Sequence, residues 1–399
     1  MLTSLTKPIR LFVLLNSLVL GLSQLPASAL ADDSSGWAYG KNGWEWSNPD
    51  TGSYFWAGLR FQTRYSTRVD EPLIPDDLRE EGDEDLHLNR ARYKIGAGFG
   101  KHFTAYHEYD LRNGRLLDLR GTWKPSTYFR LRAGQWKSEY NRERVDSSGK
   151  QQFVERSVTN YWFTVDRQSG VMASGRFASG LPADSSWWLG VLQGNGINTS
   201  GDGGKPMVVG RYQWNFTRNV LPFSQSAIPR YEEAHGSLAL AVVTNDSPYT
   251  RFSSSGGGNL PGFEKGEDNQ YRLTQFLLEY AWHKHGWSIQ SEAHYKEIDD
   301  QKSGEKNDLY GAYFQVGLFP SSLASEWPEA LEFATRVAFV DPGRRLGDNN
   351  TELTLAANWF FNGHRNKLTT DVSWLTISDI DTLEAGSDWR FRLQWDISL

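Results

Sequence analysis

Apolar and polar residues alternate one by one along much of this chain. In GSDWRFRLQWDISL, residues 386–399, Trp389, Phe391 and Leu393 fall on one side of an extended strand, while Arg390 and Arg392 fall on the other. Such alternation predicts a strand with one face in an apolar medium and the other in a polar one. The pattern recurs and predicts sixteen strands, at 53–65, 88–99, 102–111, 116–123, 128–137, 170–178, 186–193, 207–216, 236–244, 271–283, 286–297, 308–319, 330–340, 351–361, 366–377 and 387–399.

Two β architectures produce this alternation, a soluble sandwich and a transmembrane barrel. A sandwich does not require Arg, Lys, Glu and Asp so regularly opposite the apolar face. Tight connectors such as 100–101 and 362–365 alternate with long hydrophilic ones such as 138–169, although the long connector 217–235 falls on the short side. The sequence therefore predicts an all-β fold, a transmembrane antiparallel β-barrel of about 16 strands with short periplasmic turns and long external loops.

Composition supports the barrel. Only 39% of the residues are hydrophobic, yet the chain holds 17 Trp, 17 Tyr and 21 Phe. This combination is typical of a barrel with a wet interior and aromatic girdles on its outside, whereas a disordered chain would be poor in aromatics. The absence of cysteine excludes disulfides and thiolate metal sites.

The first 31 residues have the pattern of a secretory signal peptide. Lys7 and Arg10 precede an apolar stretch at 11–22, and Ala29-Leu30-Ala31 fits a cleavage site. The stretch is too short to cross about 30 Å of hydrocarbon comfortably. We therefore expect a signal peptide at 1–31, an N-terminal segment at 32–52 and a barrel domain at 53–399, located in the Gram-negative outer membrane.

Charge is segregated along the sequence. Residues 86–218 hold 20 Lys and Arg against 10 Asp and Glu, whereas the chain from residue 32 onward has a net charge of −8. The inward positions of the predicted strands, together with the connector 138–169, supply the candidate ion-pathway residues. These are Arg60, Arg64, Arg90, Arg92, Lys94, Arg120, Arg130, Arg132, Lys137, Arg142, Arg144, Arg156, Arg176 and Arg211.

Carboxylates also point inward in this pattern, which leaves a second interpretation open. A general porin sets basic and acidic walls against each other to produce a transverse field, without selectivity for one anion. The connector 138–169 either folds inward and narrows the pore or stays outside as a solvated loop. The inward carboxylates are Glu108, Asp110, Asp118, Glu279, Glu292, Glu332, Glu352 and Asp371.

Several segments resemble the phosphate-selective porin O and P family of Gram-negative outer membranes. The resemblance lies in LNRARYKIGAGFGKHFTAYHEYDL at 88–111, in FRLRAGQWKSEYNRERV at 129–145 with its Gly-Gln-x-Lys, and in the short motifs FVERS, DRQSGV and QGNG. The resemblance implies a trimeric sixteen-stranded barrel with an arginine-lined, anion-selective channel, and a third external loop, here 138–169, that constricts the pore. The chain departs from the family in its acidic later strands and in Leu399, where a terminal Phe is commoner.

The expected function is passive diffusion of small anions, with phosphate or polyphosphate favoured by the resemblance. We expect no catalytic residue, metal site, cofactor or nucleic-acid partner; the expected partners are outer-membrane lipid and lipopolysaccharide, small anions, and two further copies in a homotrimer. One alternative is a general diffusion porin, and another is a barrel without a pore that acts as an adhesin or structural protein through the connectors 66–85 and 245–270.

Overall fold

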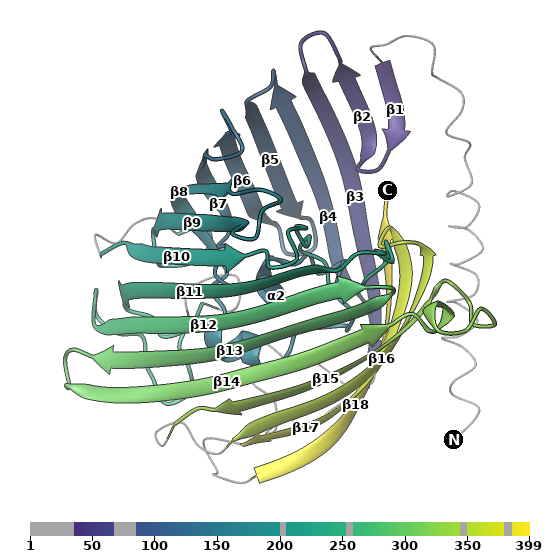
Figure 1. Cartoon of the computed structure of the whole chain (residues 1–399). Coiled ribbons are helices and arrows are strands. Elements are labelled where there is room, and N and C mark those ends of the chain that lie inside the picture. Colours follow the sequence, from purple (N-terminus) through teal and green to yellow (C-terminus); the bar gives the residue numbers. More distant parts are fainter. Residues whose placement is uncertain (1–35, 68–84, 200–204, 253–257, 344–348, 379–384) are drawn as a thin grey trace.

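The computed structural model describes residues 36–67, 85–199, 205–252, 258–343, 349–378 and 385–399, so the expected signal peptide and most of connector 66–85 lie outside the described residues. Within the described part, sixteen antiparallel strands pair in chain order, and the last pairs with the first to close a barrel (Figure 1). The strands are β3 (Ser53–Ser66), β4 (Asp85–Phe99), β5 (Phe103–Asp110), β6 (Arg115–Trp123), β7 (Arg130–Lys137), β8 (Arg167–Phe177), β9 (Ser185–Leu192), β10 (Met207–Trp214), β11 (His235–Ser247), β12 (Tyr271–Lys284), β13 (Trp287–Asp300), β14 (Glu305–Leu318), β15 (Leu331–Asp341), β16 (Asn350–Asn362), β17 (Asn366–Ser378) and β18 (Ala385–Ser398). All sixteen correspond to predicted strands.

The alternation separates the two faces of the wall. On β18, the outward Trp389 is 61% exposed, whereas the inward Arg392 and Asp396 are fully buried inside the barrel. The burial pattern of β12 has the same period of two. The apolar faces therefore look outward, where an outer-membrane barrel meets lipid.

Tight turns join the strands at one end, which is the periplasmic end of an outer-membrane barrel. Between β12 and β13 the loop is only His285 and Gly286, with φ of +48° and +79°. Positive φ at both central residues is the requirement of a type I′ hairpin turn, which matches the twist of the flanking strands. Long connectors such as 138–166 leave the other end.

A hairpin that the alternation did not predict precedes the barrel. Strands β1 (Gly36–Gly40) and β2 (Gly43–Asn48) pair with each other, and β2 pairs with the first part of β3. The end of β18 lies beside Leu59, whose amide donates to the carbonyl of Leu399 at 2.9 Å. The hairpin thus extends the wall beyond the last strand (Figure 1). Strands of five and six residues are too short for a period of two to stand out.

Part of the lumen is apolar, which corrects the expectation of a polar inner face throughout. The short helix α3 (Thr159–Phe163) belongs to the connector after β7, and its Phe163 is fully buried in a hydrophobic cluster. Inward residues of the external half of the barrel pack in the same cluster, among them Val243, Leu273 and Ile298. An apolar inner face is stable here because the connector, and not water, covers it.

No helix among the described residues is long and apolar enough to cross a membrane. The described helices are α2 (Arg142–Val145), α3 and a single 3-10 turn at Pro320–Ser322. Both α helices lie in the connector between β7 and β8.

Candidate ion pathway

The connector 138–166 runs inside the barrel and is bound to the far wall by carboxylates. Four of its backbone amides donate to inward carboxylates of β12, β13, β16 and β17. Charge-assisted hydrogen bonds of this kind are stronger than neutral ones, and inside a protein they are poorly screened. The four pairs are Arg142 with Glu279 at 3.0 Å, Glu143 with Glu292 at 2.7 Å, Val154 with Asp371 at 2.9 Å and Val158 with Glu352 at 2.9 Å.

The Arg142 side chain bonds the connector to the barrel wall. Its guanidinium pairs with Glu279 at 3.0 Å, and Glu279 also accepts from Arg211 of β10 at 2.7 Å. Arg142 and Glu279 are both fully buried. Because a buried charge is costly unless it is paired, this arrangement holds the connector to β10 and β12.

A second connector enters the barrel from the periplasmic end. Residues 215–234 join β10 to β11, and the carbonyl of Pro222 accepts a hydrogen bond from Arg142 at 3.0 Å. The guanidinium of Arg142 also lies 4.7 Å from the centre of the Phe223 ring. The amide of Gln152 donates to Gln225 at 2.8 Å. The long connector on the side of the tight turns therefore meets the external connector inside the lumen.

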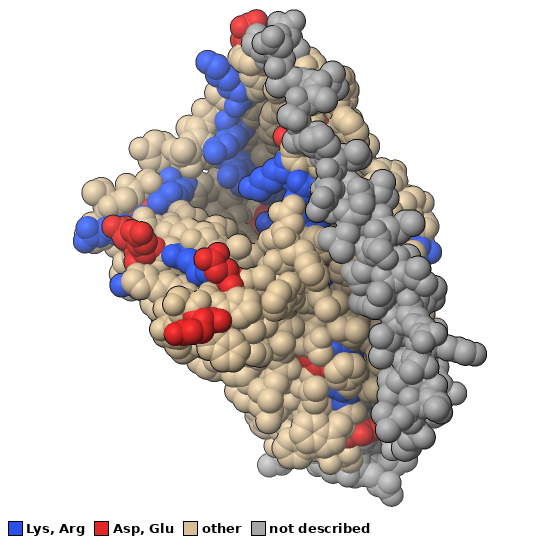
Figure 2. All heavy atoms as spheres, turned by 90° about the vertical axis from the view of Figure 1, so that its right-hand side faces the viewer, with Lys and Arg blue, Asp and Glu red and all other residues tan. Residues whose placement is uncertain are grey.

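Between connector 138–166 and the wall of β4 to β9 lies a cavity of about 340 Å³, called here the first cavity. Among the described residues, seven cationic side chains and three carboxylates line it. The cations are Arg92, Lys94, Arg120, Arg130, Arg132, Lys137 and Arg167, and the carboxylates are Glu108, Asp118 and Glu139. In the space-filling view of Figure 2, Lys and Arg side chains gather along a hollow of the surface.

A second cavity, of about 430 Å³, lies on the periplasmic side of the first. Its charged lining residues in the described part of the chain are Lys124, Arg130 and Arg176, without a carboxylate. Arg130, Trp188 and Phe223 line both cavities. The two cavities therefore adjoin, and the cationic lining continues toward the turn between β6 and β7.

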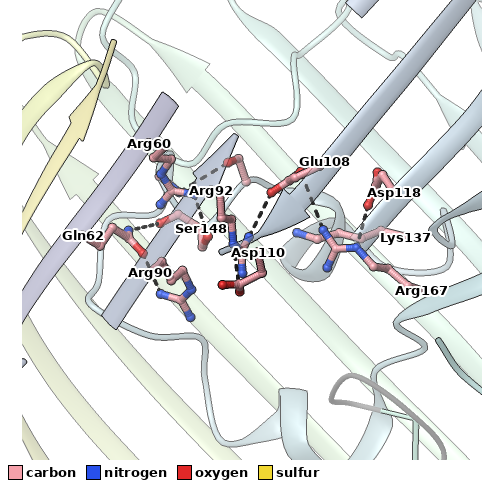
Figure 3. Close-up of polar contacts among 12 residues, drawn as sticks. Arg60, Gln62, Arg90, Arg92, Glu108, Asp110, Asp118, Lys137, Ser148 and Arg167 are labelled. Atoms are coloured by element: carbon pink, nitrogen blue, oxygen red, sulfur yellow. Dashed lines mark hydrogen bonds and ion pairs between the residues drawn. The ribbon is translucent and has the colours of Figure 1, made fainter. Parts of the chain in front are cut away.

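Most cations of the first cavity are paired. Arg92 lies 3.1 Å from Glu108 and 3.5 Å from Asp110, and Arg167 lies 2.6 Å from Asp118, as Figure 3 shows. Lys137 of β7 donates to two backbone carbonyls of the connector, those of residues 144 and 146. For the side chains of Lys94 and Arg130, by contrast, no hydrogen bond or ion pair with the described residues is found.

Seven of the fourteen sequence-derived pathway residues line these cavities. They are Arg92, Lys94, Arg120, Arg130, Arg132, Lys137 and Arg176. The other seven line neither of these two cavities, and each is bonded to another part of the protein. Arg60 pairs with Asp396, Arg64 and Arg90 with Glu155, Arg142 and Arg211 with Glu279, Arg144 with Asp166, and Arg156 donates to the carbonyls of Glu143 and Asp146.

Several lining residues were not among the candidates, and Arg167, Trp188 and Phe223 are three of them. Arg167 was assigned to the connector, but it begins β8 and points into the first cavity. Trp188 is an inward residue of β9, and the alternation there is ambiguous because Trp187 precedes it. Phe223 lies on a connector of the periplasmic end, where no residue pattern indicates an inward course.

Burial and charge set the ionisation of the connector. Although burial opposes ionisation of Glu155, Arg90 and Arg64 hold the pKa of its carboxyl well below the usual value. Burial raises the pKa of the Glu143 and Asp146 carboxyls to about 7. Glu143 accepts from the amide of Ser157 at 2.7 Å, whereas both carboxyl oxygens of Asp146 are buried without a hydrogen bond. These two acids ionise less readily than acids in water.

No group of three or more His, Cys, Asp or Glu side chains in the described residues is arranged to hold a metal ion. The His283 imidazole, near the turn of β12 and β13, is 3% exposed and faces the connectors from the periplasmic end.

Comparison with known proteins gives one family match and many fold matches. The model of the family described as phosphate-selective porin O and P matches residues 76–397. The fold is similar to that of an anion-selective porin from Comamonas acidovorans, with 9% identity over 87% of this chain and 99% of that chain and a TM-score of 0.52. It is also similar to the outer membrane channel DcaP of Acinetobacter baumannii, with 12% identity, 87% and 97% coverage and a TM-score of 0.53. No curated protein sequence matches the chain.

Proposed function

Because the chain belongs to the phosphate-selective porin O and P family, we propose that it lets small anions diffuse passively along a cationic track, with phosphate or polyphosphate favoured. Family and fold make the protein an outer-membrane porin, a channel and not an enzyme. The family implies anionic substrates, and the preference for phosphate among them is part of the proposal.

The charge balance of the first cavity carries the proposal. In the described part of the chain, its seven cationic side chains face three carboxylates, while the charged lining residues of the second cavity are all cations. An ion responds mainly to charges within a Debye length, roughly 8 Å at physiological salt. The charges that line the passage therefore affect ion selectivity more than the net charge of the whole chain, which is negative.

The carboxylates of the later strands weaken this positive field less than their number suggests. Glu279, Glu292, Glu352 and Asp371 accept hydrogen bonds from connector 138–166, and Glu279 and Asp371 also pair with Arg211 and Arg392. Carboxylates that are paired and covered exert a weak field on an ion at the opposite wall. This supports anion preference over the transverse field of a general porin.

Guanidinium groups at successive depths suit an oxyanion. Each presents a fixed fork of donors that matches phosphate oxygens, so several of them can replace hydration water in steps. Arg92 pairs with Glu108 and Arg120 pairs with Asp118, and each arginine keeps N–H donors for an anion. The pairing also weakens the attraction of each arginine for that anion. A passage whose sites bind an anion with moderate strength admits the ion and still releases it.

In this proposal connector 138–166 is the constriction. Its residues Val145, Ser147 and Ser148 line the first cavity opposite the cationic wall. Ser148 accepts from Arg60 at 2.9 Å, and Figure 3 places these residues beside Gln62 and Arg90. The connector would thus narrow the lumen and keep the anion against the arginines.

A homotrimer is part of the proposal. The outward faces of β4 and β5 carry Tyr93, His107 and Tyr109, whose rings lie together with centroids 5.3 to 6.5 Å apart. The His107 imidazole is within 3.2 Å of the Tyr93 hydroxyl. An imidazole is unfavourable against lipid but suits a subunit contact. The early strands also carry the outward Phe55, Leu59 and Phe61 of β3.

Export by cleavage near Ala31 completes the proposal, because an outer-membrane barrel must leave the cytoplasm. The intact mass of the protein purified from outer membranes should correspond to a chain that begins at or near Asp32. A mass that includes the leader would contradict it.

Ion selectivity is the direct test of the proposed function. In a planar bilayer with a potassium chloride gradient, the reversal potential should show preference for chloride, and added phosphate should block the chloride current. A channel that prefers potassium would disprove the cationic-track mechanism.

A further inference from the structure

The place where the two cavities adjoin combines aromatic rings with a cation that has no partner among the described residues. Arg130 of β7, Trp188 of β9 and Phe223 of connector 215–234 line both cavities. Trp188 and Phe223 are half-buried. These three residues, called here the neck, therefore lie at the junction between the two cavities.

Guanidinium groups lie over both rings. The Arg142 guanidinium is 4.7 Å from the centre of the Phe223 ring, and that of Arg211 is 5.5 Å from the centre of the Trp188 ring. Both arginines are buried and held by Glu279, so they fix the rings in place. A cation at one face of a ring also withdraws electron density, which makes the remaining face less repulsive toward an anion or an electron-rich ring.

The neck differs from the rest of the passage in its chemistry. Elsewhere the first cavity presents mainly charged and polar side chains, with Tyr106 and Val145 beside them, a lining that suits a compact inorganic oxyanion. At the neck, apolar ring surface lies next to Arg130, whose side chain has no hydrogen bond or ion pair with the described residues. Apolar surface beside an available guanidinium suits a carboxylate with a flat apolar body.

We propose that the neck is a binding site for small organic anions that carry a flat apolar group, with Arg130 holding the carboxylate and Trp188 and Phe223 contacting the flat group. The proposal rests on the proposed channel function and adds a second class of solute to phosphate. Ring contact excludes water from apolar surface and adds stacking to the charge pairing.

Benzoate and acetate form a matched pair of probes, because both present a carboxylate and only benzoate has a ring. In bilayers with wild-type channels, benzoate should block the chloride current at a concentration about fivefold lower than acetate does, a ratio in line with the contribution of one aromatic contact. Equal potency of the two anions in an anion-selective wild-type channel would overturn the inference while leaving the proposed function intact.

Substitutions at the neck test whether it causes the difference in blocking potency between benzoate and acetate. Trp188→Ala and Phe223→Ala should each bring benzoate close to acetate, because the ring contact is lost while the pairing of the carboxylate with Arg130 remains. Arg130→Gln should weaken both carboxylates. Trp327→Ala is the control, because Trp327 lies in a different periplasmic connector and lines neither cavity. Retention of the benzoate advantage in both ring variants, with the barrel still folded by circular dichroism, would refute the site.

Discussion

The Arg142 guanidinium contacts the Phe223 ring with 4.7 Å between its central carbon and the ring centre. The contact joins a connector from the external end of the barrel to one from the periplasmic end. On its other side Arg142 pairs with Glu279 of β12. One buried arginine thereby fixes both connectors that fill the lumen.

Glu279→Gln should loosen both connectors, because it leaves Arg142 and Arg211 buried without a counter-charge. Removal of one partner of a buried ion pair costs about 3–5 kcal/mol. We expect a lower temperature of unfolding in detergent, measured by circular dichroism, and noisier single-channel current. Glu297→Gln is the matched control, since Glu297 pairs with Lys306 on the exposed surface at 3.3 Å and exposed pairs contribute about 0–1 kcal/mol. Equal effects of the two substitutions would contradict the role of Glu279.

The double substitution Lys94→Gln with Arg130→Gln should reduce anion preference without unfolding the barrel. Neither side chain has an ion pair with the described residues, so their loss leaves no described carboxylate unpaired. Because each charge lies in the lining of the first cavity, we expect the chloride-to-potassium permeability ratio to fall about threefold or more. Reversal potentials in a salt gradient measure the ratio.

The control for selectivity is Arg112→Gln, because Arg112 lies in the external turn between β5 and β6 and is exposed. It removes one positive charge without touching either cavity. If Arg112→Gln changed the reversal potential as much as the double substitution, total charge would decide selectivity and the cationic track would not.

Proton binding to the connector should stabilise the protein. The pKa values of Glu143 and Asp146 rise to about 7 from ordinary values of 4.5 and 3.8. Between these values the two carboxyls bind more protons in the folded protein than in the unfolded chain, so the stability that they contribute falls as pH rises through this window and levels off above about 7. Between pH 4 and pH 8 the unfolding temperature of the wild type should therefore fall relative to that of Glu143→Gln, which lacks one of the two groups. A difference between the two proteins that stays constant across the window would refute the assignment.

A charge on the outward face of β5 should prevent trimer formation. His107→Asp places a carboxylate between Tyr93 and Tyr109, where burial against another subunit would be costly. We expect the wild type to sediment as a trimer in mild detergent and the variant as a monomer with unchanged circular dichroism. A monomeric wild type would refute the proposed assembly.

The strands were predictable from sequence because lipid and lumen impose a period of two on each of them. Every predicted strand was confirmed, including β6 and β7 with their short turn at 124–129. The cavities were less predictable. Arg60 and Arg92 are both inward arginines, and the sequence does not reveal that Asp396, from the other end of the chain, pairs with Arg60 at 2.9 Å. Partners so distant in sequence meet only when the barrel closes.

The apolar lumen was missed for a similar reason. Val243 and Leu273 occupy inward positions, and a period of two assigns such positions to water unless a covering segment is known. Phe163 of α3 provides that cover from more than seventy residues earlier in the chain. Alternation indicates which face of a strand meets an apolar medium. It does not show whether water or a connector covers the inner face.

The attachment of connector 138–166 to β12, β13, β16 and β17 divides the barrel into two parts with separate tasks. The strands from β4 to β9 line the first cavity, and the later strands hold the connector. Substitutions in the first group can therefore change which anion passes while the connector keeps its anchors. Closely related channels with different solutes would be expected to diverge in the first part and to keep the carboxylates of the second.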